Sequence, residues 1–77
     1  MDFTFSIEKK LGILKEGSKD GWSREVNLVS WNGQQPPKID IREWSPDHTK
    51  MSRGITLSET EAERLIQAIA EHLEGRA

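Results

Sequence analysis

Two tryptophans and two basic residues are the side chains of this sequence whose chemistry stands out. Trp31 ends one stretch of alternating polar and apolar residues. The next such stretch carries Lys38, Arg42 and Trp44 on one parity. Alternate side chains of a β-strand point to the same side of its sheet. An unpaired nucleic-acid strand is bound by such a mixture, because cations contact its phosphates while aromatic rings stack on its bases. The group therefore predicts a surface for single-stranded nucleic acid.

The same positions have a structural interpretation that the sequence leaves open. Small domains often pack a tryptophan over the edge of a sheet, so a place in the core is the alternative for Trp31 and Trp44. Trp22 shares its parity with apolar residues of its strand, which favours packing in the core or in a dimer. Asp40 shares a face with the cations, and we expect it to orient them or to balance their charge.

Patterns typical of enzymes are missing. The sequence has no cysteine, no glycine-rich phosphate loop and no nucleophile motif. Asp40 and Glu43 have opposite parities, so they do not form an acid–base pair. We expect His48 and His72 to be exposed without a role, and Asp47 with His48 lacks the further ligands that a metal needs. The prediction is no enzyme, no catalytic residue, no metal or other cofactor and no small-molecule substrate.

Length and composition predict a small protein that is stabilised by association. The chain has 77 residues, of which 34% are hydrophobic, and we interpret 1–77 as a single domain. A chain of this length buries only about 60% of the surface of its unfolded form, so a homo-oligomer is expected. No apolar run reaches the length of a membrane span, and the first residues lack a signal-peptide pattern. With the absence of cysteine, this predicts a cytoplasmic protein without a membrane segment.

The charge is distributed unevenly along the chain. A net charge of −2 on its own argues against a nucleic-acid partner. Residues 1–53, however, carry nine Lys or Arg against eight Asp or Glu, whereas residues 54–77 carry two against five. The excess negative charge therefore belongs to the C-terminal segment, away from the tryptophans.

The C-terminal segment has the clearest secondary-structure pattern. Ser58 and Glu61 match a capping box, and apolar residues then recur every three or four positions until Gly75. The pattern predicts a helix over about 59–74. One thin sheet does not cover its whole apolar stripe, which predicts a homodimer. The expected interface residues are Leu65, Ile66, Ile69 and Leu73.

Four upstream segments alternate as β-strands do, and turn-forming residues separate them. They cover about residues 3–15, 22–31, 38–44 and 53–57. We therefore predict the α+β class, with an antiparallel four-stranded meander followed by one helix (β-β-β-β-α). The polar loop 32–37 is expected to be too long for a two-residue hairpin, although it begins with Asn-Gly.

Strand parity also assigns the faces of this sheet. The tryptophans and cations share one face, and the helix is expected to cover the other. The apolar residues expected under the helix are Val26, Leu28, Ile39, Ile41, Ile55 and Leu57.

Two segments together resemble the positive cofactor 4 family of transcriptional coactivators, above all its short bacterial members. They are residues 39–44 (Ile-Asp-Ile-Arg-Glu-Trp) with the turn at 45–47, and residues 53–58 (Arg-Gly-Ile-Thr-Leu-Ser) before the helix. The likeness is close over 38–69 and extends from Trp22. It implies a curved four-stranded antiparallel sheet, dimerisation through the C-terminal helices, and single-stranded DNA bound along a basic and aromatic channel.

The resemblance also implies roles for individual residues. Arg42 matches a strand arginine that contacts the nucleic-acid backbone, and Trp31 matches an aromatic residue that stacks on a base. Trp44 falls where the family has an aromatic pair. Lys38 lies close to a basic position, and Arg53 matches the basic residue before the Gly-Ile-Thr-Leu stretch.

The leading hypothesis is a homodimer that binds single-stranded DNA largely without sequence preference. It acts as a coactivator-like factor or in DNA handling, in association with the nucleoid. Trp31 and Trp44 stack on bases in this hypothesis. Phosphate contacts come from Lys38, Arg42 and Arg53, with help from Lys50, Arg24 and Lys10. The alternatives are a protein-interaction module that docks on the transcription or replication machinery, and an RNA-binding variant of the same fold.

Overall fold

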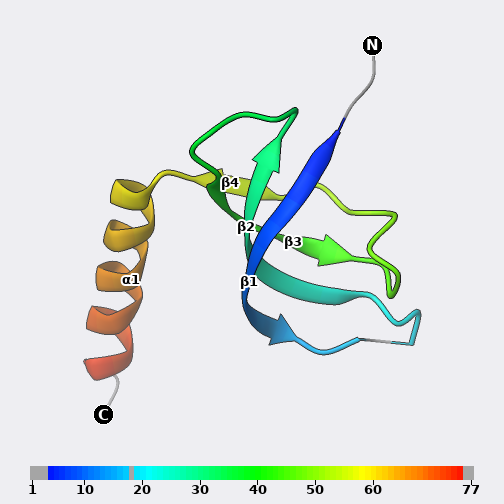
Figure 1. The fold of residues 1–77 in the computed structure, drawn as a ribbon. Helices are drawn as coiled ribbons and strands as arrows, with labels where there is room; N and C mark the ends of the chain where they lie inside the picture. The colour runs from blue at the N-terminus through cyan, green and yellow to red at the C-terminus, as the bar shows by residue number, and fades with distance from the viewer. Residues whose placement is uncertain (1–3, 18, 76–77) are drawn as a thin grey trace.

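Four antiparallel strands form one open sheet in chain order, and a single helix follows them (Figure 1). The computed structural model describes residues 4–17 and 19–75. The elements are β1 (Phe5–Lys15), β2 (Ser23–Trp31), β3 (Lys38–Trp44), β4 (Ile55–Leu57) and α1 (Glu59–Glu74). The α+β class and the β-β-β-β-α order are confirmed. β4 is shorter than the predicted segment 53–57, and residue 3 of the first predicted strand lies outside the described residues.

The pairing of β2 with β3 follows the alternation of their side chains. Val26 pairs with Ile41 and Leu28 with Ile39, without a register shift. β1 pairs with β2 less regularly, because its register shifts at three places between Ile7 and Lys15. Such bulges bend a strand and increase its twist. β1 accordingly curves across the sheet (Figure 1).

The connection between β2 and β3 starts with a tight turn. Asn32 and Gly33 have φ angles of 53° and 75°, and the Gln34 amide donates to the Trp31 carbonyl at 3.0 Å. Both central residues occupy the left-handed region, which Asn-Gly favours. The chain then runs on through residues 34–37 to Lys38, so the prediction that this loop is too long for a two-residue hairpin is confirmed.

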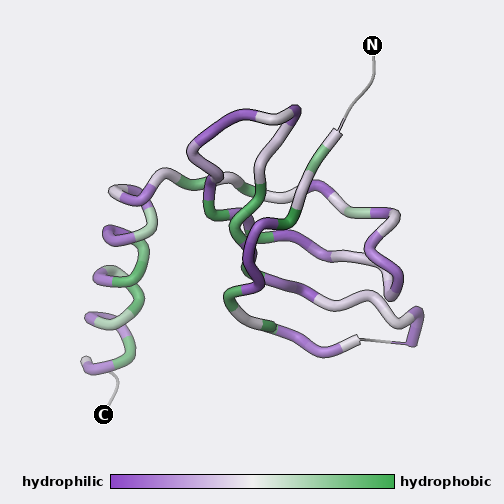
Figure 2. The backbone as a smooth tube through the Cα atoms, viewed as in Figure 1, coloured by the Kyte–Doolittle hydropathy of each residue, from purple (hydrophilic) through white to green (hydrophobic). Residues whose placement is uncertain are grey.

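The helix begins as its sequence predicts. The Glu61 amide donates to the Ser58 hydroxyl, and the Glu61 carboxylate accepts from the Ser58 amide at 2.8 Å. Hydrophobic residues follow one side of α1 (Figure 2). None of the helix residues is buried, however, and α1 stands beside the sheet with contacts to β3 and β4. The expectation that α1 covers the sheet is therefore wrong for the single chain, in which Ile55 is 54% exposed.

The most deeply buried side chains lie on the opposite face of the sheet. Trp44, Val29, Asn27 and Asp40 are each at most 1% exposed, and they belong to β2 and β3. The chain after β3 folds back here, because the Ser45 amide donates to the Lys50 carbonyl and an isolated bridge joins Trp44 to Met51. The curved sheet and this turn enclose a small core without any contribution from the helix.

Candidate nucleic-acid interface

A cation and an aromatic ring lie together on the face of the sheet away from the apolar side of α1. The Cζ atom of Arg42 is 4.5 Å from the centre of the Trp31 ring. This is within the range of a cation–π interaction. Trp31 is partly exposed at the end of β2, and Phe5 of β1 lies beside it with ring centres 6.0 Å apart. The sequence prediction that Trp31 and Arg42 share a face is confirmed. We call Trp31, Arg42 and Phe5 the Trp31 cluster.

Asp40 holds Arg42 in this position. Its two carboxylate oxygens accept from Nε and Nη2 of Arg42, both at 2.6 Å, and Asp40 is fully buried. The expected role of Asp40 as an orienting and charge-balancing partner is confirmed. Nη1 of Arg42 donates to the Met51 sulfur and the Ser52 carbonyl. A guanidinium has five N–H groups. These bonds use four of them, so one N–H on Nη2 has no hydrogen-bond partner among the described residues and is available to a phosphate.

Gly54 permits the chain to pass close to Arg42. A Cβ atom at this position would collide with the Arg42 side chain and the Ile41 carbonyl. The glycine is therefore required by contact and not by its φ angle. Arg53, which directly precedes Gly54, is exposed.

Trp44 is buried, although its predicted role of stacking on a base requires an exposed ring. It is 0% exposed, and its ring packs between Phe5 and His48, with ring centres 5.2 and 5.6 Å away. A ring without exposed surface has no face for a base. The stacking role predicted for Trp44 must therefore be replaced by a role in packing, which was the alternative that the sequence left open.

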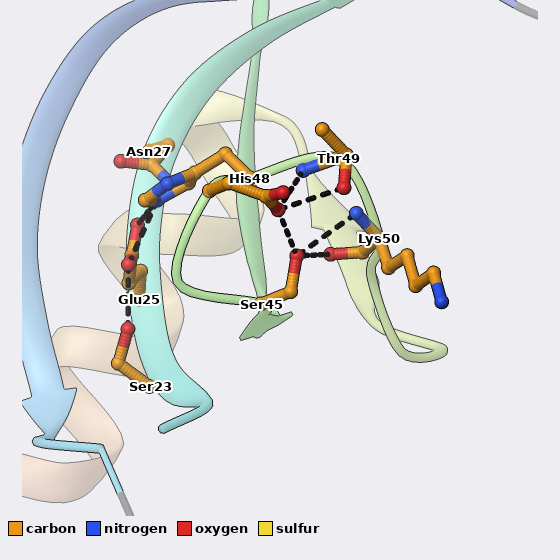
Figure 3. Close-up of polar contacts among 8 residues, drawn as sticks. Ser23, Glu25, Asn27, Ser45, His48, Thr49 and Lys50 are labelled. Carbon is orange, nitrogen blue, oxygen red and sulfur yellow. Dashed lines mark hydrogen bonds and ion pairs between the residues drawn. The ribbon is translucent and has the colours of Figure 1, made fainter. Parts of the chain in front are cut away.

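The turn that covers Trp44 is anchored to β2 by His48. The Nε2 atom of His48 is 3.0 Å from both carboxylate oxygens of Glu25 (Figure 3). Ser23 and Asn27 also donate to this carboxylate, at 2.6 and 3.2 Å. The expectation that His48 is exposed without a role is therefore wrong. Its partner is 23 positions away in the sequence, and no local pattern points to it.

Hydrogen bonds keep two carboxylates of this region ionised. Burial alone would raise the pKa of Glu25, but the bonds from Ser23, His48 and Asn27 outweigh burial, so this pKa is lower than usual. The side chain and backbone of Thr49, together with Ser45, donate to Asp47 and lower its pKa to about 2. Both carboxylates thus act as acceptors that order the turn.

The predicted phosphate-binding cations are distributed over several regions. Lys10 is exposed on β1, where it pairs with Asn27 and borders a depression with Glu25. Lys38 is exposed at the start of β3, and its charge contributes to the low pKa of Glu61 after the hydrogen bonds from Ser58. Strand pairing therefore puts Lys10 and Lys38 on the Trp31 side of the sheet, and Arg53 is exposed beside Gly54.

Two of the predicted cations lie elsewhere. Arg24 is paired with Glu43 at 3.2 Å, and its parity is that of Val26 on the opposite face of the sheet. Lys50 belongs to the turn after β3, where it borders a depression with Trp22. Arg24 is thus not part of the Trp31 face, and Lys50 lies at the far end of β2 from Trp31. Trp22 borders the same depression and is partly exposed, so it does not occupy the core, which was one of the two places expected for it.

The comparison with known proteins agrees with this geometry. Residues 18–68 match the family model of Transcriptional Coactivator p15 (PC4), and this match includes β2, β3, β4 and the first part of α1. The chain belongs to the PC4 family. An uncharacterized protein of Treponema pallidum (strain Nichols) is similar to it, with 47% identity over 60 residues that cover 78% of this chain and 68% of that protein.

Membership of the PC4 family supports a DNA-binding, coactivator-like role, and the family is not one of enzymes. The helix in the described part of the chain lacks the length and hydrophobicity needed to cross a bilayer. Within the same residues, no three His, Cys, Asp or Glu side chains gather as metal ligands would. The matched segment contains Trp31 and Arg42 but not Phe5. The sequence did not indicate Phe5 as a site residue either, because no local pattern at the start of β1 distinguishes it.

Proposed function

We propose that this chain binds single-stranded DNA, largely without sequence preference, through the Trp31 face of its sheet. The observation that carries the proposal is the Arg42 guanidinium over the Trp31 ring on the face away from the apolar side of α1, within the segment that matches the PC4 family. In this role the exposed part of the Trp31 side chain stacks on a base. Arg42 supplies its remaining N–H group to a phosphate.

The other phosphate contacts come from flexible side chains around this cluster. Lys10, Lys38 and Arg53 are all exposed, and the described residues contain no ion pair for any of them. Long cationic side chains follow a mobile phosphate backbone without reading bases, which fits weak sequence preference. The cellular role that follows is that of a coactivator-like or DNA-handling protein at the nucleoid, with residues 1–77 acting as one domain.

The proposed active form is a homodimer. A groove of about 310 Å³ between the sheet and α1 is lined by apolar side chains. Ile66, Ile69 and Leu73 are 68%, 50% and 50% exposed, and Leu65 is 39% exposed. Exposed apolar surface of this extent in so small a chain favours association through the same surface of a second copy. Two copies would carry two Trp31 faces.

The test is an anisotropy titration of labelled oligo-dT with wild-type protein at about 50 and about 200 mM salt. We expect micromolar or tighter binding at the lower salt and a steep loss at the higher, because bound cations release counterions from the strand. A labelled duplex of the same length serves as the comparison. Equal affinity for duplex, or no binding of oligo-dT at micromolar protein, would refute the proposal.

The site itself is tested by replacing Trp31. Trp31→Ala removes the proposed base contact, so affinity should fall roughly five- to a hundredfold, the equivalent of about 1–3 kcal/mol for one stacked base. Arg24→Ala is the matched control, because Arg24 is an exposed residue on the opposite face. If Arg24→Ala weakens binding as much as Trp31→Ala does, the strand does not follow the Trp31 face.

A further inference from the structure

A second aromatic residue with a cation beside it lies at the other end of β2. Trp22 precedes β2, and together with the turn after β3 it encloses a depression of about 350 Å³. The walls are Trp22, Ser45, Pro46, Asp47, Thr49 and Lys50. Trp22 and Trp31 are nine positions apart along β2, which corresponds to about 30 Å of extended chain. It is therefore a separate site and not part of the Trp31 cluster.

Backbone and side-chain contacts fix the shape of this depression. The Ser45 hydroxyl accepts from the Lys50 amide at 3.0 Å, and the Ser45 amide donates to the Lys50 carbonyl at 3.0 Å. Gly21 lies directly against Pro46, so that a Cβ atom at Gly21 would come within 2.9 Å of the proline ring. The segment before β2 and the turn after β3 are thus held together, and Trp22 and Pro46 both line the depression between them.

Two charged side chains line the depression, and the structure engages them differently. The Asp47 carboxylate accepts from the Ser45 hydroxyl and from the amide and hydroxyl of Thr49, at 2.7 to 3.0 Å. All three bonds go to Oδ1, and the carboxylate stays ionised, with a pKa of about 2. The Lys50 side chain points away from these bonds (Figure 3), is exposed, and has no ion pair in the part of the chain that the structure describes.

From these observations we infer that the depression binds one unpaired nucleotide, with its base stacked on Trp22 against Pro46 and its phosphate at the Lys50 ammonium. An aromatic platform beside an unpaired cation is the combination that binds single strands without reading their sequence. The inference rests on the proposed single-strand binding and extends it. A strand held at Trp31 must span about 30 Å, the length of β2, to occupy this second site as well.

The length of the oligonucleotide separates the two sites in an experiment. Wild type, Trp22→Ala and Lys50→Ala are titrated with labelled oligo-dT of about 4 and about 16 nucleotides, the range that single-strand-binding folds cover. Each variant should bind the longer strand at least fivefold more weakly than wild type, whereas the short strand should retain at least half of its affinity through Trp31.

Two control variants isolate the chemistry. Trp22→Phe keeps an aromatic ring, so it should preserve most of the affinity that Trp22→Ala loses. Arg64→Ala removes an exposed cation of α1 and should have no effect on either strand. If Trp22→Ala does not fold, Lys50→Ala and Trp22→Phe still decide the matter, because Lys50 contributes to the turn only through its backbone.

The outcomes distinguish this site from the Trp31 face. Suppose that Trp22→Ala and Lys50→Ala both bind the long strand within twofold of the wild-type affinity. That result would overturn the Trp22 site and leave the proposed function standing. An equal effect of Lys50→Ala and Arg64→Ala would also overturn it, since any cation would then serve. A wild-type protein that binds neither strand would remove both proposals.

Discussion

At the scale of single residues, the two tryptophans of the predicted stacking pair have different roles. Trp44 is enclosed by Phe5, His48 and the turn, whereas Trp31 keeps part of its surface exposed. Trp44→Ala should therefore lower the free energy of unfolding by about 3–5 kcal/mol, as for other large-to-small changes in a core. Urea denaturation followed by circular dichroism measures this loss.

Trp31→Ala is the comparison for that measurement. It should lower the free energy of unfolding by less than half as much, since the Trp31 ring is partly exposed. Equal losses in the two variants would mean that Trp31 is also a core residue. In that case the binding face would have to lie elsewhere.

Asp40 and Arg42 form a pair whose members should respond unequally to substitution. Asp40 is 0% exposed and the Arg42 side chain 13% exposed. Arg42→Met leaves a fully buried carboxylate without its cation, which typically lowers stability by about 3–5 kcal/mol. Asp40→Asn should be milder, because the freed guanidinium can move into solvent. The double variant should recover part of the loss of Arg42→Met, and a purely additive loss in urea denaturation would contradict the pairing.

At the scale of elements, the turn after β3 should loosen in acid. Asp47 and Glu25 both have a pKa below the unfolded values of 3.8 and 4.5, and that of Asp47 is about 2. A lowered folded pKa means that these groups stabilise the fold at higher pH, and that this contribution disappears as the pH falls from 4.5 toward 2. Unfolding free energies measured in urea at several pH values should fall across this window.

Asp47→Asn tests whether Asp47 causes the loss of stability at the low-pH end of this range. This variant should show a smaller loss of stability between pH 3.8 and pH 2 than wild type. Glu63→Gln is the control, because Glu63 is exposed on α1 and makes no hydrogen bond or ion pair that orders the turn. A pH dependence that Glu63→Gln changes and Asp47→Asn leaves intact would refute the role of the turn.

The order and type of the elements were predictable because each depends on local patterns. The alternation in β2 and β3 and the capping box at Ser58 are recorded in consecutive residues, and the observed strands and helix follow them. Strand parity likewise predicted that Trp31 and Arg42 lie on the same face of the sheet. The cover over Trp44 was not predictable in this way, since it depends on the contact of His48 with Glu25 and on the curvature that the bulges of β1 produce. Parity assigns a side chain to a side of the sheet, but it does not reveal what lies on top.

At the scale of the whole molecule, the exposed apolar side of α1 predicts the assembly. Ile66→Glu introduces a charge at the centre of the proposed interface, where the wild-type side chain is 68% exposed in the single chain. The variant should sediment as a monomer at tens of micromolar, where wild type sediments as a dimer. Gln67→Glu adds the same charge off the apolar stripe and should remain dimeric. A wild-type monomer at these concentrations would remove the dimer from the proposal.

The central claim is that the Trp31 face receives a single strand, and an NMR titration with unlabelled oligo-dT tests it most directly. Amide and indole signals of the ¹⁵N-labelled wild-type protein are followed as the strand is added. We expect the largest shifts at the Trp31 indole, the Arg42 side chain and the Gly54 amide, with Glu63 and Glu71 on α1 unaffected. Shifts confined to α1, or no shifts with excess oligo-dT, would contradict the account.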